Sequence, residues 1–409
     1  MDNVKAPDIC LLSLDGGGVR GLSSLFILQR LMRSINALRR YGAKPPLRPY
    51  EVFDLIGGTS TGGIIAIMLG RLKMDVDDCI KAYQSLSAQV FSKKHSLINW
   101  GGAIQGRFDT QELENCIKNI VKNQGMPEDV LMRDTGDSPC KVFVCAITKR
   151  HNTLNRLRTY ESKRGMEFDE LKVWEAARAT SAATGFFDAL DTMEESFIDG
   201  APLANNPIME IWNEAGDIWS PIASRIKCLV SIGTGRSSLE PFRDSLGGIV
   251  NTLAKIATDT ERKANEFAMD KRDLLQNQRY FRFNVDRGLD QVGLEEVKKI
   301  QDIRSATAVY LEDQNTYLAL ERCVGLLGDR GSSTATNPSR GLHVDQLTPR
   351  IPLIVRQSFR NGWERNRPAA EELLSKLLEK PWSIEIDINA IYPFIKREDH
   401  GDIGNMINT

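Results

Sequence analysis

Gly58-Thr59-Ser60-Thr61-Gly62 is the stretch around which the chain is organised. The apolar run Val52 to Ile56 precedes it and predicts a buried strand, and the apolar run Gly63 to Leu69 follows it and predicts a buried helix. A small-residue turn that joins a strand to a helix and carries one serine is the G-x-S-x-G pattern of a nucleophile elbow. Gly58 and Gly62 fit this reading, because so sharp a turn brings backbone too close for side chains.

A second small-residue turn, Gly16-Gly17-Gly18, follows the apolar run Ile9 to Leu14, which predicts another buried strand. Glycines let backbone N–H groups turn inward without a Cβ in the way. We therefore expect this turn to supply an oxyanion hole, the donors that stabilise a tetrahedral intermediate in acyl transfer. Arg20 either adds a positive charge to that site or points to solvent.

A serine nucleophile also needs a base. Four histidines are present, and none has a setting that indicates catalysis, although His151 lies just past a predicted strand. Asp199 is better placed, because it ends the apolar run Ser196 to Ile198 and is followed by the small-residue turn Gly200-Ala201. Burial makes a carboxylate more basic. We expect Asp199 to accept the serine proton, and the alternative is an aspartate that only forms a turn.

Predicted strands and helices alternate along the chain, which indicates an α/β fold with a mostly parallel sheet covered on both faces. The segment 15–18, Ser60 and Asp199 each follow a predicted strand. Because the carboxyl ends of parallel strands meet at one edge, we expect these residues to converge there. The other predicted strands are 141–148, 154–160 and 225–232, and the other predicted helices are 22 to before 45, 75–91, 110 onward, 173–181, 246–256, 294–322 and 369–379.

At 409 residues the chain is long enough for one large domain with an extension. We expect a catalytic core at 8–235 and a helical extension at 236–330, whose strand 280–285 completes the catalytic domain. A Ser-, Thr- and Gly-containing flexible linker is expected at 331–341, followed by a C-terminal tail at 342–409.

The formal net charge of −1 gives no global field that favours nucleic acid or a membrane. The start of the chain lacks the apolar core of a signal peptide, and no apolar run is long enough to span a bilayer. Seven singly scattered cysteines indicate reduced thiols and a cytoplasmic protein. We expect no metal or cofactor, since no acidic calcium loop is present.

Gly16 to Gly21 also fits the G-x-G-x-x-G fingerprint of dinucleotide-binding folds. That fingerprint needs an acidic residue about 20 positions further on, to bind the ribose. No acid occurs between Arg20 and Glu51, so nucleotide binding is the weaker hypothesis. Gly58 to Gly62 is not a phosphate-binding loop either, because no lysine follows it.

The chain resembles the patatin-like phospholipases in three motifs: Asp15 to Gly21, Gly58 to Gly62 and Asp199 to Ala201. The segments 179–183 and 205–207 are also similar, whereas Thr184 departs from a proline common in the family. The resemblance implies a three-layer α/β/α sandwich and a Ser-Asp dyad without histidine. By this resemblance Ser60 is the nucleophile, Asp199 is the base, and Gly16, Gly17 and Gly18 with Arg20 form the oxyanion site.

The sequence therefore predicts a calcium-independent lipid acyl hydrolase of the phospholipase A type, which works through an acyl-enzyme and reaches its lipid by peripheral membrane contact. Two alternatives stay open. One is a conventional Ser-His-Asp esterase, and the other is an effector module at the N-terminus of a larger signalling or immune-type protein. The sequence does not indicate the oligomeric state, the lipid head group or the acyl position.

Overall fold

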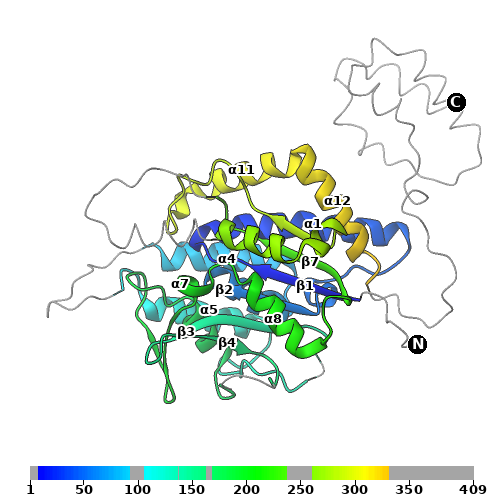
Figure 1. Cartoon of the computed structure of the whole chain (residues 1–409). Helices are drawn as coiled ribbons and strands as arrows, with labels where there is room; N and C mark the ends of the chain where they lie inside the picture. Colours follow the sequence, from blue (N-terminus) through cyan, green and yellow to red (C-terminus); the bar gives the residue numbers. More distant parts are fainter. Residues whose placement is uncertain (1–7, 93–105, 137, 163–167, 237–259, 331–409) are drawn as a thin grey trace, which may run out of the picture. The chain divides into compact units, whose positions relative to one another are not determined.

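The computed structural model describes residues 8–92, 106–136, 138–162, 168–236 and 260–330 (Figure 1). The helix predicted at 246–256 lies outside these ranges, and so does the apolar stretch of sequence at 97–102. So do the predicted linker at 331–341 and the tail at 342–409, with its predicted helix at 369–379.

Eight strands among the described residues form one sheet in the order β5-β6-β3-β2-β1-β7-β8, with β4 also paired to β3. Neighbours β3-β2, β2-β1, β1-β7 and β7-β8 are all parallel. The predicted mostly parallel sheet is thus confirmed, and the late strand β8 joins it beside β7. The bounds are β1 Ile9–Leu14, β2 Leu55–Thr59, β3 Lys141–Thr148, β4 Thr153–Arg158, β5 Leu190–Asp191, β6 Ser196–Asp199, β7 Ile226–Ile232 and β8 Tyr280–Phe283.

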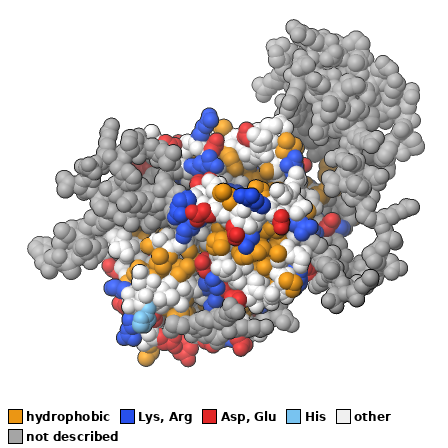
Figure 2. Space-filling model, viewed as in Figure 1, with side chains coloured by type: hydrophobic (Ala, Val, Ile, Leu, Met, Phe, Trp, Pro, Cys, Tyr) orange, Lys and Arg blue, Asp and Glu red, His pale blue; other side chains and the backbone are white. Residues whose placement is uncertain are grey.

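Helices cover both faces of the sheet, which makes a three-layer α/β/α fold (Figure 1). The larger core lies under α1 Gly21–Tyr41, α3 Thr61–Ala66, α4 Val76–Val90, α5 Thr110–Asn123, α6 Val173–Thr180, α11 Ile300–Glu312 and α12 Gln314–Leu327. A smaller core lies under α8 Ile208–Trp219, the helical segment from Thr260, and α10 Arg272–Gln276. Apolar and charged side chains are interspersed on the surface seen in Figure 2.

Two predicted boundaries were wrong, each for a local reason. Residues Pro49–Val52 form the short helix α2, with proline in its first turn, so the strand before the elbow begins only at Leu55. The helix predicted from residue 110 begins there as α5, and Asp109 caps it, because its carboxylate accepts from the N–H groups of Gln111 and Glu112. The helix predicted at 294–322 is divided at Asp313, which is extended and caps α12.

All seven cysteines are free and buried. Within the described part of the chain, no helix is long and apolar enough to cross a membrane.

The central strand β3 brings the ends of two other strands together. β4 pairs with β3 along Phe143 to Thr148 and so occupies one edge of it. The other edge is shared: β2 pairs in parallel up to Thr59 opposite Cys145, and β6 pairs antiparallel with Asp199 opposite Ala146. The two strands therefore run toward each other along this edge and meet end to end. The register of the sheet thus brings Ser60 and Asp199 together.

Behind this junction a buried ion-pair network ties β4 to α8. The Glu214 carboxylate is 1% exposed and accepts from Arg158 Nε at 2.6 Å, from Arg156 Nη1 at 2.8 Å and from the Tyr160 hydroxyl at 2.8 Å. Burial alone would raise the pKa of Glu214, but hydrogen bonds and charges from Arg158, Tyr160 and Arg156 outweigh burial and hold the pKa below its ordinary value.

We predict that Glu214→Gln lowers the free energy of unfolding at pH 7 by about 3–5 kcal/mol, because two arginines lose a buried partner. A depressed pKa contributes stability above pH 4.5 that is lost as pH falls through the folded-state value, so the loss should shrink in acid. Urea unfolding measures it. The control is Glu128, which forms an exposed ion pair with Lys122. Glu128→Gln should cost about 0–1 kcal/mol. Equal losses in both variants would contradict the account.

Candidate active site

Ser60 occupies a strained turn between β2 and α3. Its φ of 55° and ψ of −125° are rare for a residue with a side chain. A Cβ on Gly58 would lie 2.1 Å from the Gly62 carbonyl oxygen, and one on Gly62 would lie 2.2 Å from the Leu14 carbonyl oxygen. The two glycines are thus required by close backbone contact, as the sequence predicts, and Gly62 packs the elbow against the end of β1.

Thr180 at the end of α6 fixes the elbow from the side. Its hydroxyl accepts a hydrogen bond from the Ser60 N–H at 2.9 Å and donates to the Cys145 carbonyl on β3 at 2.7 Å. A Cβ on Gly63 would lie 2.7 Å from this threonine side chain. The sequence alone indicates no separate role for Thr180. It lies in the segment 179–183, whose similarity to the patatin-like phospholipases is the one sequence feature that could have pointed to it.

Asp199 ends β6 and is 3% exposed. Its Oδ1 accepts from the Ala201 N–H at 2.8 Å, and its own N–H donates to the Ala182 carbonyl. Gly200 is required here, because a Cβ would lie 2.6 Å from the Cys145 carbonyl oxygen. The turn predicted around the aspartate therefore holds one carboxylate oxygen and leaves the other available.

Burial raises the pKa of Asp199 to about 7, while the Ser60 side chain and the Ala201 N–H oppose the rise. Oδ2 is buried and has no hydrogen-bond partner of standard geometry among the described residues. The Ser60 hydroxyl is thus close enough to the carboxyl group to lower its pKa. A pKa near neutrality suits a base that takes and returns a proton.

The glycine turn lies beside the elbow, as predicted. The Gly16 N–H donates to the Asn205 carbonyl at 3.0 Å, so it is already occupied. The Gly18 carbonyl accepts from the Thr61 hydroxyl at 3.1 Å and from the Tyr83 hydroxyl at 3.0 Å, which ties the turn to α3 and α4. The N–H groups of Gly17 and Gly18 donate to no described residue. These two donors are therefore free to bind a ligand.

Arg20 directly precedes α1, as its N-cap residue, and is buried, contrary to the solvent-facing alternative. Burial lowers its pKa to about 10. Its Nε is buried without a hydrogen-bond partner, and its guanidinium forms no ion pair with any residue that the structure describes. A buried charge without a partner is costly, so this one is an observation that needs a functional explanation.

Of the four histidines, His151 is exposed in the β3–β4 turn, and His95, His343 and His400 lie outside the described residues.

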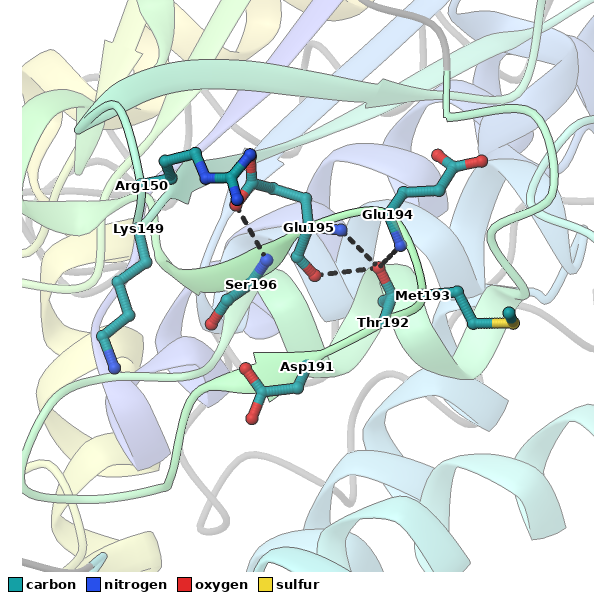
Figure 3. A pocket seen from close by; sticks show the side chains of 8 residues that line it. All are labelled: Lys149, Arg150, Asp191, Thr192, Met193, Glu194, Glu195 and Ser196. Atoms are coloured by element: carbon teal, nitrogen blue, oxygen red, sulfur yellow. Dashed lines mark hydrogen bonds between the residues drawn. The ribbon is translucent and has the colours of Figure 1, made fainter.

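The described part of the chain contains no cluster of three or more His, Cys, Asp or Glu side chains that could hold a metal ion. An open pocket of about 450 Å³ lies on the hairpin β5–β6 and the residues just past β3 (Figure 3), and neither Ser60 nor Asp199 lines it.

The chain is similar in sequence to two curated phospholipases and aligns with one solved structure. Human calcium-independent phospholipase A2-gamma is 30% identical over 338 residues, which cover 74% of this chain and 39% of that protein. Phospholipase A I of Arabidopsis thaliana is 27% identical over 347 residues, which cover 70% of this chain and 25% of that protein. The crystal structure of VipD from Legionella pneumophila aligns with a TM-score of 0.34 and 11% identity, over 75% of this chain and 67% of that chain.

The chain thus spans about two fifths or less of the length of these two curated relatives. A family model described as patatin-like phospholipase matches residues 12–212, the range that holds the glycine turn, Ser60 and Asp199. Residues 12–212 of this chain therefore form a domain of the patatin-like phospholipase family.

Proposed function

We propose that this chain hydrolyses fatty-acyl esters of lipids through a Ser60-Asp199 dyad. The observation that carries the proposal is the shared edge of β3, where the strand that ends at Thr59 and the strand that ends at Asp199 meet. The dyad is supported by this register together with the strained backbone of Ser60 and the burial of Asp199. No third residue is needed to connect the serine with the carboxylate.

In the first half-reaction Asp199 takes the proton of the Ser60 hydroxyl, and Ser60 Oγ attacks the carbonyl carbon of the ester. The developing oxyanion receives hydrogen bonds from the free N–H groups of Gly17 and Gly18, with the charge of Arg20 nearby. The Gly16 N–H serves the turn itself, through Asn205. The intermediate collapses, the C–O bond breaks, and protonated Asp199 gives its proton to the leaving alcohol.

In the second half-reaction Asp199 takes a proton from water, and the resulting hydroxide attacks the acyl-enzyme. The fatty acid leaves as the proton returns to Ser60 Oγ, so one water is consumed for each ester cleaved. The same carboxylate acts twice as base and twice as acid. A pKa of about 7 makes both directions accessible near neutral pH.

The names of the relatives support a phospholipid as the substrate class. Such a substrate lies in a membrane or micelle, so the proposal includes peripheral contact with a lipid surface and work in the cytoplasm.

We predict that Ser60→Ala abolishes hydrolysis of phosphatidylcholine in mixed micelles, because the attacking oxygen is removed. Circular dichroism should show an unchanged fold. The control is Ser85→Ala on an exposed face of α4, which should keep wild-type activity. Hydrolysis by the Ser60→Ala protein at the wild-type rate would sink the proposal.

We predict that kcat/KM falls below a midpoint of about pH 7, because the base must be ionised and the Asp199 pKa is raised to that value. Asp199→Asn should remove activity, whereas His151→Ala should leave both the rate and the midpoint unchanged. The pH profile of ester hydrolysis measures this. Loss of turnover in the histidine variant alone would favour the Ser-His-Asp alternative.

We predict that Asp199→Asn stabilises the fold at pH 8. The folded-state pKa of about 7 exceeds the ordinary 3.8, so the stability from this group is fully present below pH 3.8 and is lost as pH rises through 7. At about 1.4 kcal/mol per pKa unit, the ionised carboxylate costs up to roughly 4 kcal/mol. Calorimetry should give a higher Tm for the variant at pH 8 and little gain at pH 4. A lower Tm at pH 8 would contradict the raised pKa.

A further inference from the structure

The orientation of the two free N–H groups depends on hydrogen bonds to the carbonyls of the same peptide units. A peptide unit is planar and its N–H points opposite to its C=O. The Gly17 N–H shares a unit with the Gly16 carbonyl, which accepts from the Thr234 hydroxyl at 2.9 Å. The Gly18 N–H shares a unit with the Gly17 carbonyl, which accepts from the Arg20 N–H at 3.2 Å. Each free donor is therefore aimed by the bond on the far side of its own peptide unit.

Thr234 comes from a distant part of the chain. It follows β7, is 5% exposed, and lies so close to the glycine turn that a Cβ on Gly17 would be 2.1 Å from its hydroxyl oxygen. The Gly16 carbonyl is held from this one side chain, whereas the Gly16 N–H is held by Asn205. Both backbone polar groups of Gly16 are thus fixed by residues more than 180 positions away.

A buried ionic cluster holds the Thr234 segment against the glycine turn. Arg282 on β8 donates to both oxygens of Asp15, at 3.1 and 2.7 Å, and to Glu261 Oε1 at 2.8 Å. Arg282 also packs against Gly233, because a Cβ built on that glycine would lie 2.8 Å from Arg282 Nη2. Asp15 directly precedes the glycine turn. Arg282 therefore contacts the segments on both sides of the Thr234 bond.

Burial lowers the pKa of Arg282, but the charges of Asp15 and Glu261 outweigh it and raise that pKa above its ordinary value. Arg282 therefore stays charged. Asn284 completes the cluster, since its amide donates to Glu261 Oε1 at 2.8 Å and its Oδ1 accepts from the Gly235 N–H at 2.6 Å. Buried ion pairs are weak stabilisers, because desolvation offsets their attraction. Fixed geometry at the glycine turn is the property that this cluster supplies.

We infer that Thr234 is a positioning residue of the oxyanion site: its hydroxyl aims the Gly17 N–H through the Gly16 carbonyl, and Arg282 holds its segment in place. The inference rests on the proposed function, and it extends the site beyond residues 12–212 of the family match. The segment after β7 and the strand β8 then supply residues that position the oxyanion site. A donor that is set before the substrate binds costs no reorganisation during the reaction.

The test compares Thr234→Val with Thr234→Ser in steady-state hydrolysis of a soluble short-chain ester. Valine keeps the shape and removes the hydroxyl, whereas serine keeps the hydroxyl. Loss of a whole oxyanion donor costs about 100–1000-fold, so a misaimed one in Thr234→Val should cost about 10–100-fold in kcat. KM should stay within about twofold of wild type, because the bond matters when the oxyanion forms. The serine variant should stay within about threefold in kcat, since its hydroxyl can still donate.

A second pair tests the cluster without touching the turn. Glu261→Gln removes the charge that orients Arg282 and should lower kcat several-fold. Arg236→Gln, which loses only the exposed partner of Glu261, should leave kcat unchanged. The pH midpoint of about 7 set by Asp199 should not move in any of these variants. Thermal unfolding identifies any variant that has lost its fold, in which case the other pair decides.

Wild-type kcat in folded Thr234→Val overturns the inference, and so does an equal loss in Thr234→Ser. A raised KM with unchanged kcat would also overturn it, because Thr234 would then act on substrate binding. If Ser60→Ala is inactive and Thr234→Val is normal, only this inference fails. If Ser60→Ala is active, the proposed function fails and this inference fails with it.

Discussion

The edge of β3 is the constraint on which the rest of the site depends. β4 takes one edge of this strand, so β2 and β6 must share the other and meet end to end between Cys145 and Ala146. A shift by one residue would turn the side chains of either strand to the opposite face of the sheet. The buried network around Glu214 holds β4 against α8, and Thr180 bonds both to the elbow and to β3. The register is therefore secured from both faces.

This arrangement stores free energy at the point where the chemistry is proposed. Ser60 has an unfavourable backbone conformation. Among the described residues, one oxygen of the buried Asp199 has no hydrogen-bond partner and the buried cation Arg20 has no ion-pair partner. Each of these features lowers the free energy of unfolding, and the packing of the two hydrophobic cores must offset that loss. A binding or catalytic site explains the pattern, because substrate and transition state bring the missing partners: an oxygen to protonate and an oxyanion to stabilise.

Local motifs made much of this predictable from the sequence. The strand-turn-helix pattern around Gly58 to Gly62 and the glycine turn have short-range causes, and the structure confirms their placement at one edge of the sheet. Asp199 could be chosen over the histidines because an apolar strand ends at it. The partners that hold these motifs could not be predicted. Thr234 and Arg282 reach the glycine turn only through the pairing of β1 with β7 and of β7 with β8, and no local pattern in the sequence encodes that contact.

Chemical trapping of the nucleophile tests the central claim, the Ser60-Asp199 dyad, most directly. A fluorophosphonate reacts with an activated serine and leaves a stable adduct that peptide mass spectrometry can place. At pH 8 the account predicts one adduct, on the peptide that carries Ser60, and a labelling rate at least about 100-fold lower in Asp199→Asn, because the serine then has no base. An adduct on another residue, or equally fast labelling of Ser60 in the Asp199→Asn protein, would contradict it.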